Sequence, residues 1–371
     1  MKNFLTLRIN YNSKEYIPHL DGIRGIAILL VLFAHFCRFQ PFTKLAEGGW
    51  IGVDLFFVLS GFLITGILLE SKEKANFFKN FYARRTLRIF PVYYLLLVVL
   101  LLIIPFTGIK LPEGYDYFLK VKLFYFLYFQ NNLPTFDGWP PNEMLSHLWS
   151  LAIEEQFYLI WPLVIYFCNK KQIIFFSVIV ILASILLRYS NPEVTFAYFS
   201  SLTRFDGLIL GGIVAIMIRF HKKVLEQFAP LVFIAVIIGL GYALWNTQWK
   251  FSNSNYYFIR WGYTAISIFW CCILVFSFSA GRFSRLVNLL YNNRFIKYCG
   301  KISYGLYLFH MVIYGFFAGT LVSFFRSFKI ENLDEHGLLV SICILVMTFM
   351  VSMFSFKFFE SPILKLKARF H

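Results

Sequence analysis

The sequence predicts an all-α integral membrane protein, a polytopic helical bundle with about ten transmembrane helices plus a short re-entrant or interfacial segment. The first observation is composition: 59% of the 371 residues are hydrophobic and 15% are charged, whereas soluble domains average about 45–50% apolar and about 25% charged residues. The second observation is a series of eleven apolar runs. They cover residues 23–39, 50–69, 89–107, 118–129, 148–168, 172–188, 204–219, 229–245, 259–280, 304–325 and 338–358.

Ten of these runs are interpreted as membrane spans, because a transmembrane helix needs about 17–25 residues. The run 118–129 is short and carries Lys120 and Lys122, so it is the re-entrant or interfacial piece. Ten spans place both termini on one side of the membrane. Most of the 35 Lys and Arg residues lie in the polar segments of that side. Basic residues are enriched in cytoplasmic segments, so the termini are expected to be cytoplasmic.

We expect one membrane domain over residues 1–371, with a cytoplasmic segment at 1–19, a long outer loop at 108–146 and a cytoplasmic tail at 359–371. The net charge of +16 would also suit a nucleic-acid-binding protein. The basic residues lie between apolar runs, however, so membrane lipids are the expected partner and nucleic acid is not. The six cysteines lack metal-ligand spacing, and no metal is expected.

The first span, Leu20–Phe36, carries Arg24 at its start and His35 inside its apolar part. An ionisable residue within a span is energetically costly, which makes both residues functional candidates. Eleven helical residues turn about 20° more than three full turns and rise about 16 Å, so the two side chains share one face at different depths. Alternatively, Arg24 is a surface anchor and His35 a hydrogen-bonded core residue.

The second span carries Asp54 about one turn below its outer end. It is expected to pair with a cation or to cap a helix, although a role toward substrate stays open. Ser60 and Gly61 follow, and small residues allow helices to approach closely.

Three arginines, Arg84, Arg85 and Arg88, mark the cytoplasmic start of the third span. Arg85 and Arg88 are three residues apart and share a helix face. Guanidinium groups suit phosphate binding because they present paired donors. The positive-inside rule alone also explains arginines here, so both interpretations stay open.

The fifth span begins His147–Leu–Trp149 and carries the adjacent carboxylates Glu154 and Glu155. Two acids in an apolar helix are hard to explain by packing. One of them near His35 would orient the imidazole, and a carboxylate can also act as a general base on a hydroxyl.

Three later motifs complete the candidate set. Arg204 and Asp206 begin the seventh span and are expected to neutralise each other. Tyr304 and His310 lie at the start of the tenth span and are expected on the donor side, where His310 would line a donor path or be a satisfied core residue. Glu360 is expected to cap a helix or pair with a basic residue, and Pro362 to end the last helix.

Seven motifs together, in this order, resemble the acyltransferase-3 family, from about Tyr16 to Pro362. They are LDGIRGIAILLVLFAH, GVDLFFVLSGFLIT, RRTLRIFP, HLWSLAIEEQFYLIWP, RFDGLILG, ISYGLYLFH and FFESP. The resemblance implies a bacterial inner-membrane enzyme. Such enzymes take an acyl group, usually acetyl, from cytoplasmic acyl-CoA and pass it to a hydroxyl of a glycan or similar acceptor.

The resemblance also implies residue roles. It makes His35 the catalytic histidine, Arg24 its partner in an arginine–ten residues–histidine motif, and Arg85 with Arg88 the donor-side pair. Trp149 and Glu154 match the family's tryptophan and glutamate. Some members carry an additional outer SGNH-type esterase domain. This chain stops at His371, so we expect the membrane domain or a partner to complete the transfer.

The sequence therefore predicts an O-acyltransferase with acyl-CoA as donor, acetyl-CoA above all, and a glycan or lipid-linked saccharide as acceptor. Two alternatives stay open. One is a transporter or flippase of a lipid-linked sugar, in which the buried His and acids relay protons. The other is an acyltransferase acting on a small hydrophobic molecule such as a macrolide.

Overall fold

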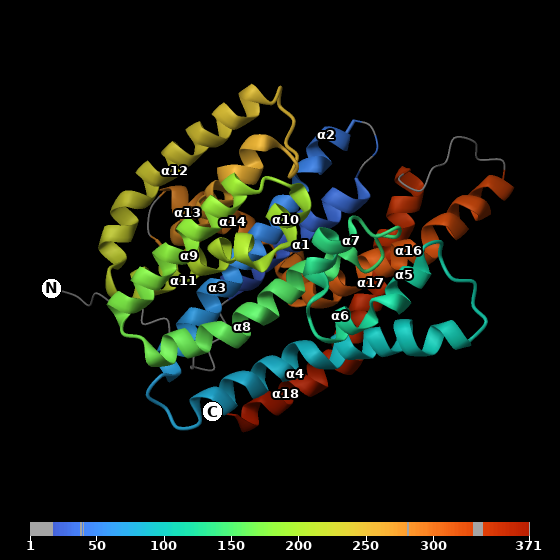
Figure 1. Ribbon diagram of the computed structural model, residues 1–371, viewed down its shortest axis with the longest axis horizontal. Helices are drawn as coiled ribbons and strands as arrows, with labels where there is room; N and C mark the ends of the chain where they lie inside the picture. The colour runs from blue at the N-terminus through green and yellow to red at the C-terminus, as the bar shows by residue number, and fades with distance from the viewer. Residues whose placement is uncertain (1–17, 38, 40, 280–281, 329–336, 371) are drawn as a thin grey trace.

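The computed structural model describes residues 18–37, 39, 41–279, 282–328 and 337–370, and this part of the chain is helical without a strand (Figure 1). The prediction of an all-α bundle is confirmed. The cytoplasmic segment predicted at 1–19 lies outside the described residues except for its last two, which begin the first helix.

Eight helical segments of the described residues are long and apolar enough to cross a membrane. They are Thr43–Ser71, Phe77–Phe106, Lys170–Ser190, Val194–Phe220, Lys222–Asn246, Phe258–Phe278, Ser303–Ser327 and Leu338–Arg369. Their principal helices are α3 (Ile51–Ser71), α4 (Phe77–Val98), α9 (Lys170–Ser190), α11 (Ser201–Phe220), α12 (Lys222–Asn246), α13 (Tyr263–Phe278), α16 (Ser303–Ser327) and α17 (Leu338–Ser355). The other two predicted spans are α1 (Pro18–Phe36) and α8 (Trp149–Phe167), of 19 residues each. The chain is therefore a multi-pass membrane protein.

The run 118–129 does not form a membrane-length helix. It is divided between α5 (Tyr115–Lys120) and α6 (Lys122–Phe126), of 6 and 5 residues, and α7 (Leu133–Asp137) follows. Helices this short rise less than about 10 Å and cannot span a bilayer. Two tyrosines of α4 hold the segment: Tyr93 donates a hydrogen bond to the Tyr125 carbonyl at 2.8 Å, and Tyr94 donates one to the Phe126 carbonyl at 3.0 Å.

The centre of the bundle is the close contact between α3 and α11. A methyl group placed on Gly61 would lie 1.7 Å from the Leu208 carbonyl oxygen, and one on Gly211 would lie 1.9 Å from that of Val58. Only glycine permits such an approach, which confirms the close packing expected at Ser60 and Gly61.

Glycines fix α1 in the same way. It packs against α15 (Arg294–Lys301), a short helix between the predicted spans 259–280 and 304–325. A methyl group on Gly25 would lie 1.9 Å from the Ile296 carbonyl oxygen, and one on Gly300 would lie 1.7 Å from that of Asp21. The backbone that carries Arg24 and His35 is therefore held rigidly.

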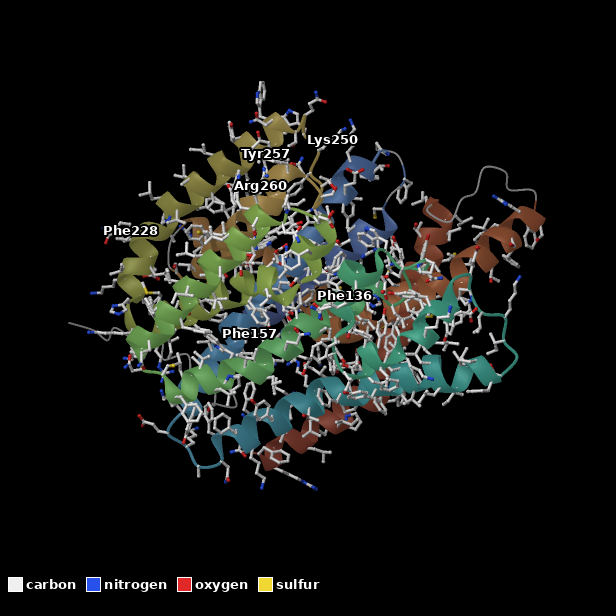
Figure 2. All side chains as sticks on the ribbon, viewed as in Figure 1. Phe136, Phe157, Phe228, Lys250, Tyr257 and Arg260 are labelled. Atoms are coloured by element: carbon white, nitrogen blue, oxygen red, sulfur yellow. The ribbon has the colours of Figure 1, made fainter. Side chains whose placement is uncertain are left out.

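The outer surface of α12 is apolar and faces away from the bundle. Phe228 is 52% exposed, and Leu231 and Ile238 are 65% and 67% exposed. Figure 2 shows Phe228 at the edge of the molecule, beyond the ribbon of α12. Such a surface fits contact with lipid chains.

The last span continues beyond the predicted end. A π-helical turn at Phe356–Glu360 leads into α18 (Ser361–Lys365) and a 3-10 turn, Leu366–Arg369. The expectation that Pro362 ends the helix is wrong: it occupies the first turn of α18, where its missing N–H needs no acceptor. α18 lies beside α4 (Figure 1).

Candidate functional site

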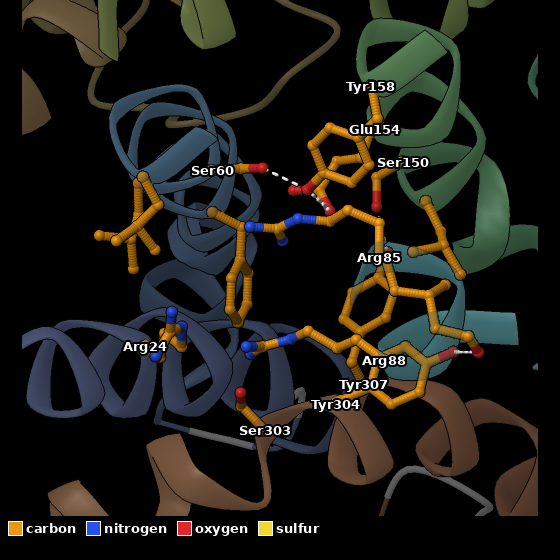
Figure 3. Close-up of a pocket in the computed structure, with 15 residues that line it drawn as sticks. Arg24, Ser60, Arg85, Arg88, Ser150, Glu154, Tyr158, Ser303, Tyr304 and Tyr307 are labelled. Atoms are coloured by element: carbon orange, nitrogen blue, oxygen red, sulfur yellow. Dashed lines mark hydrogen bonds between the residues drawn. The ribbon is translucent and has the colours of Figure 1, made fainter. Parts of the chain in front are cut away.

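A cavity of about 770 Å³ opens where the starts of α1, α4 and α16 meet. We call it the arginine cavity because Arg24, Arg85 and Arg88 point toward one another within it (Figure 3). Tyr304, predicted on the donor side, also lines it, and its hydroxyl donates a hydrogen bond to the Ile89 carbonyl at 2.7 Å. The structure thus brings together four of the five predicted donor-side residues.

Positive charge dominates the arginine cavity. Arg24 donates a hydrogen bond to Asp21 at 2.7 Å, and the Arg84 Nε is buried without a hydrogen-bond partner among the described residues. Lys367, in the turn after α18, is not part of the cavity lining but lies near enough to be repelled by all four arginines of this side, Arg24, Arg84, Arg85 and Arg88. The sequence analysis missed this residue. A cavity in which positive charges outnumber negative ones attracts an anion.

The helix α8 supplies one polar face of the same cavity. Ser150, Glu154 and Tyr158 lie four residues apart and all line it. The Tyr158 hydroxyl donates to Glu154 Oε2 at 3.1 Å and shares a hydrogen bond with the Ser60 hydroxyl. The Arg85 guanidinium lies 5.3 Å from the centroid of the Tyr158 ring.

The acids of α8 do not meet the expectation that one of them accompanies His35. Glu154 lies in the arginine cavity, whereas His35 lines a different one. Glu155 points elsewhere, and its Oε1 is buried without a hydrogen-bond partner in the described part of the chain. Its interaction with Arg85 is electrostatic.

The second cavity has a volume of about 1040 Å³, and we call it the histidine cavity because His35 and His147 line it. Trp149 lines it as well. The segment 108–146 contributes Trp139, Glu143 and Ser146 to its wall. The long loop is therefore part of this cavity and not only a connector.

Three histidine rings meet beside this cavity. The ring centroid of His310 lies 5.1 Å from that of His35 and 4.7 Å from that of His147. His310 is fully buried, with its Nδ1 2.7 Å from the Tyr307 carbonyl oxygen. His310 therefore accompanies His35 and does not line the arginine cavity, contrary to the donor-path expectation. The described residues contain no group of His, Cys, Asp and Glu side chains arranged to hold a metal ion.

Asp54 and Arg204 form a buried ion pair, with 2.6 Å between Asp54 Oδ1 and Arg204 Nη2. The Arg204 guanidinium also lies 4.4 Å from the Tyr263 ring centroid and 5.0 Å from that of Tyr198. Tyr198 and Trp149, whose ring centroids are 4.7 Å apart, line the histidine cavity. The ion pair thus packs against the aromatic side chains that form one wall of the histidine cavity.

The predicted pair between Arg204 and Asp206 is wrong. Asp206 instead pairs with Arg188 of α9 at 3.0 Å, and Thr264 donates a hydrogen bond to the same carboxylate oxygen at 2.5 Å. Residues two apart on a helix point about 200° away from each other, so each charge finds its partner on a different neighbouring helix.

Sequence reasoning missed His147 and Tyr307 as site residues, besides Lys367 and Arg188. A signal for Tyr307 was present, because Tyr304, Tyr307 and His310 recur every three residues along one side of α16. His147 directly precedes the acidic span and offered no spacing signal of its own.

The fold and the two cavities define a class: a multi-pass membrane protein in which one helix links a cationic cavity to a histidine cavity. Residues 17–356 match the family model described as an acyltransferase domain. The chain belongs to the acyltransferase-3 family. No solved structure shows a significant match to it.

The similar curated proteins are bacterial. The chain is 30% identical to the O-acetyltransferase OatA of Staphylococcus aureus (strain NCTC 8325 / PS 47) over 98% of this chain and 60% of that protein. It is 28% identical to the peptidoglycan O-acetyltransferase OatA of Listeria monocytogenes over 95% of this chain and 56% of that protein. The chain thus spans less than two thirds of the length of these relatives.

Proposed function

We propose that the protein transfers an acetyl group from acetyl-CoA to a hydroxyl of a cell-surface or lipid-linked glycan in a bacterial cytoplasmic membrane. One observation carries this proposal: the rigid helix α1 presents Arg24 to the cationic cavity and His35 to the other cavity. The names of both relatives describe O-acetyltransferases, and one of them a peptidoglycan O-acetyltransferase.

The arginine cavity is the proposed donor site. Coenzyme A is polyanionic, and the guanidinium groups of Arg24, Arg85 and Arg88 offer paired N–H donors for its phosphates. Arg24 and His35 are separated by about 16 Å along α1. The extended pantetheine arm bridges this distance, so that the thioester reaches His35 while the phosphates stay among the arginines. Because acetyl-CoA is a cytoplasmic donor, the arginine cavity and both chain termini are proposed to lie on the cytoplasmic side.

His35 is the proposed general base. It takes the proton of the acceptor hydroxyl as the oxygen attacks the thioester carbonyl carbon, which forms the C–O bond. The C–S bond then breaks, and the proton returns from His35 to the departing thiolate. The His310 ring packs against His35 and the His147 ring packs against His310, so His310, supported by His147, holds the imidazole in place during both proton transfers. Glu154 has a different role, which is to anchor Tyr158 beside Arg85.

The histidine cavity is the proposed acceptor site. Its wall includes residues of the long loop, which suits an acceptor that enters from the side of that loop. Trp139 and Trp149 offer aromatic faces, and Glu143 offers a carboxylate that can accept hydrogen bonds from sugar hydroxyls. A glycan with several hydroxyl groups is therefore preferred over a macrolide-like acceptor.

The decisive experiment compares His35→Ala with His221→Ala in membranes that contain the full-length protein. His221 lies at the exposed turn between α11 and α12 and lines neither cavity, which makes it a matched control. Acetyl-CoA consumption and the acetyl mass increment on surface glycans are measured together. His35→Ala should abolish both and His221→Ala neither. Normal transfer by the His35→Ala protein would rule out the assignment, and the absence of any acetyl-CoA consumption by the unaltered protein would favour a transporter.

A further inference from the structure

Tyr307 of α16 lies at the boundary between the two cavities. It lines both the arginine cavity and the histidine cavity, and it is the one residue common to their walls as the described residues form them. Its side chain is only partly buried, which agrees with a ring that faces open space. The route from one cavity to the other therefore passes this side chain.

Hydrogen bonds hold the Tyr307 ring across the space between α16 and α8. The hydroxyl donates to the His147 carbonyl oxygen at 2.5 Å and lies 2.6 Å from the Ser150 Oγ. Ser150 lines the arginine cavity, and His147 lines the histidine cavity. One partner thus belongs to each side. The centroid of the Tyr307 ring also lies 6.2 Å from that of the Phe56 ring on α3. Tyr307 and Phe56 together therefore narrow the space between the two cavities.

We infer that Tyr307 is a gate between the donor and acceptor cavities, an assignment that rests on the proposed function for its biological meaning. A thioester moving from the arginines toward His35 meets the phenol ring. The ring can swing aside by breaking its two hydrogen bonds, without displacement of a helix. In the closed position it separates the arginine cavity from water on the side of the long loop. Tyr307 is thus a positioning residue that controls access to His35.

The first test measures access and does not involve acetyl-CoA. Leu63 lines the arginine cavity, so a Leu63→Cys protein reports on that space. A membrane-impermeant thiol reagent is applied from either side of oriented vesicles, and modification at position 63 is quantified by peptide mass spectrometry, which leaves the native cysteines in place. With Tyr307 present, labelling should occur from the arginine side and not from the loop side. In Leu63→Cys/Tyr307→Ala, loop-side labelling should rise several-fold.

Two further variants keep this test interpretable. Tyr307→Phe retains the ring but loses both hydroxyl contacts, and it should give intermediate loop-side labelling. Tyr314→Ala removes a tyrosine two turns further along α16 that lines neither cavity, and it should behave as the parent. Arginine-side labelling of every variant verifies that the protein is folded. Equal loop-side labelling of the parent and Tyr307→Ala proteins, or equal effects of Tyr307→Ala and Tyr314→Ala, would overturn the inference.

The second test links the gate to the reaction. Acetyl-CoA hydrolysis without acceptor should rise several-fold in Tyr307→Ala, because water then reaches the thioester. A rise in loop-side labelling in Tyr307→Ala, without any acetyl-CoA turnover by the parent, would leave the gate in place and remove acetyl-CoA as its donor. If the parent consumes acetyl-CoA but Tyr307→Ala leaves loop-side labelling unchanged, the gate is ruled out and the proposed function stands.

Discussion

The ion pair between Asp54 and Arg204 gives a quantitative prediction about the wall of the histidine cavity. The two side chains are 2% and 1% exposed, and their charged atoms lie 2.6 Å apart. The neighbouring pair of Arg188 and Asp206 is equally enclosed, so this region contains two cations and two anions in balance. Replacing Asp54 by Leu leaves one uncompensated cation in the interior.

The expected cost follows from this imbalance. Removing one partner of a buried ion pair typically destabilises a protein by about 3–5 kcal/mol. We expect that range for Asp54→Leu and for Arg204→Met alone. The double variant restores electrical balance and fills an aromatic environment with apolar atoms, so it should recover to within about 1–2 kcal/mol of the parent. The resulting coupling free energy is at least about 4 kcal/mol.

The assay is equilibrium unfolding of the purified protein in mixed micelles, followed by tryptophan fluorescence for the parent, both single variants and the double variant. Additive costs, or a single-variant cost below about 1 kcal/mol, would refute the argument that the charges stabilise each other. Acetyl transfer by the double variant adds a functional readout. Retained transfer identifies the pair as structural support, whereas a folded but inactive double variant would show that Asp54 or Arg204 also contacts the acceptor.

Three further predictions concern the donor site and the packing of α1. Arg85→Ala should weaken acetyl-CoA binding by about 10-fold to 100-fold, the equivalent of one charge-assisted hydrogen-bond contact, with a smaller change in the rate at saturating donor; an unchanged affinity would remove Arg85 from the donor site. Lys367→Ala should weaken the same binding less, and the loss should diminish at high salt because the residue acts through charge, whereas a salt-independent loss would contradict this role. Gly300→Val should abolish accumulation of folded protein, because its side chain would overlap the Asp21 carbonyl; normal thermal stability in detergent would show that α1 and α15 can separate.

The membrane-length helices were readable from the sequence because the lipid environment imposes their apolar length. The run 172–188 corresponds to Lys170–Ser190, and the run 148–168 to Trp149–Phe167. Apolar length dictates such segments, so their limits agree within about two residues. The two amphipathic helices α14 (Arg282–Tyr291) and α15 lie between the predicted spans 259–280 and 304–325, where the apolar runs indicated no helix. They are too short and too polar to be predicted as membrane spans from an apolar run. Their role becomes clear only in the structure, where they pack against α1.

The position of each candidate residue along its own helix was predictable from the sequence. Which residues of different helices face one another was not. Arg24 of α1 meets Arg85 and Arg88 of α4 in one cavity, and the charge pattern had placed all three near the starts of predicted spans. The side chain that contacts His35 depends on which helix packs beside α1. The spacing of residues along a single helix does not predict which helices are neighbours. Glu154 of α8 faces the arginine cavity. His310 reaches His35 from α16 instead.

The packing of α1 bears on how the two cavities communicate. An alternating-access transporter needs helices that rock or slide against each other around a central site. Here α1 contacts α15 through Gly25 and α3 through Gly52, where an added methyl group would lie 1.9 Å from the Ile296 and 2.5 Å from the Ala27 carbonyl oxygen. Interfaces of this closeness do not slide without a steric clash. The helix that carries Arg24 and His35 therefore acts as a fixed frame, and the movement that joins the cavities is left to a side chain. A fixed frame with a small gate suits the passage of a narrow acyl-bearing arm between two bound substrates, and it does not suit the transport of a whole saccharide.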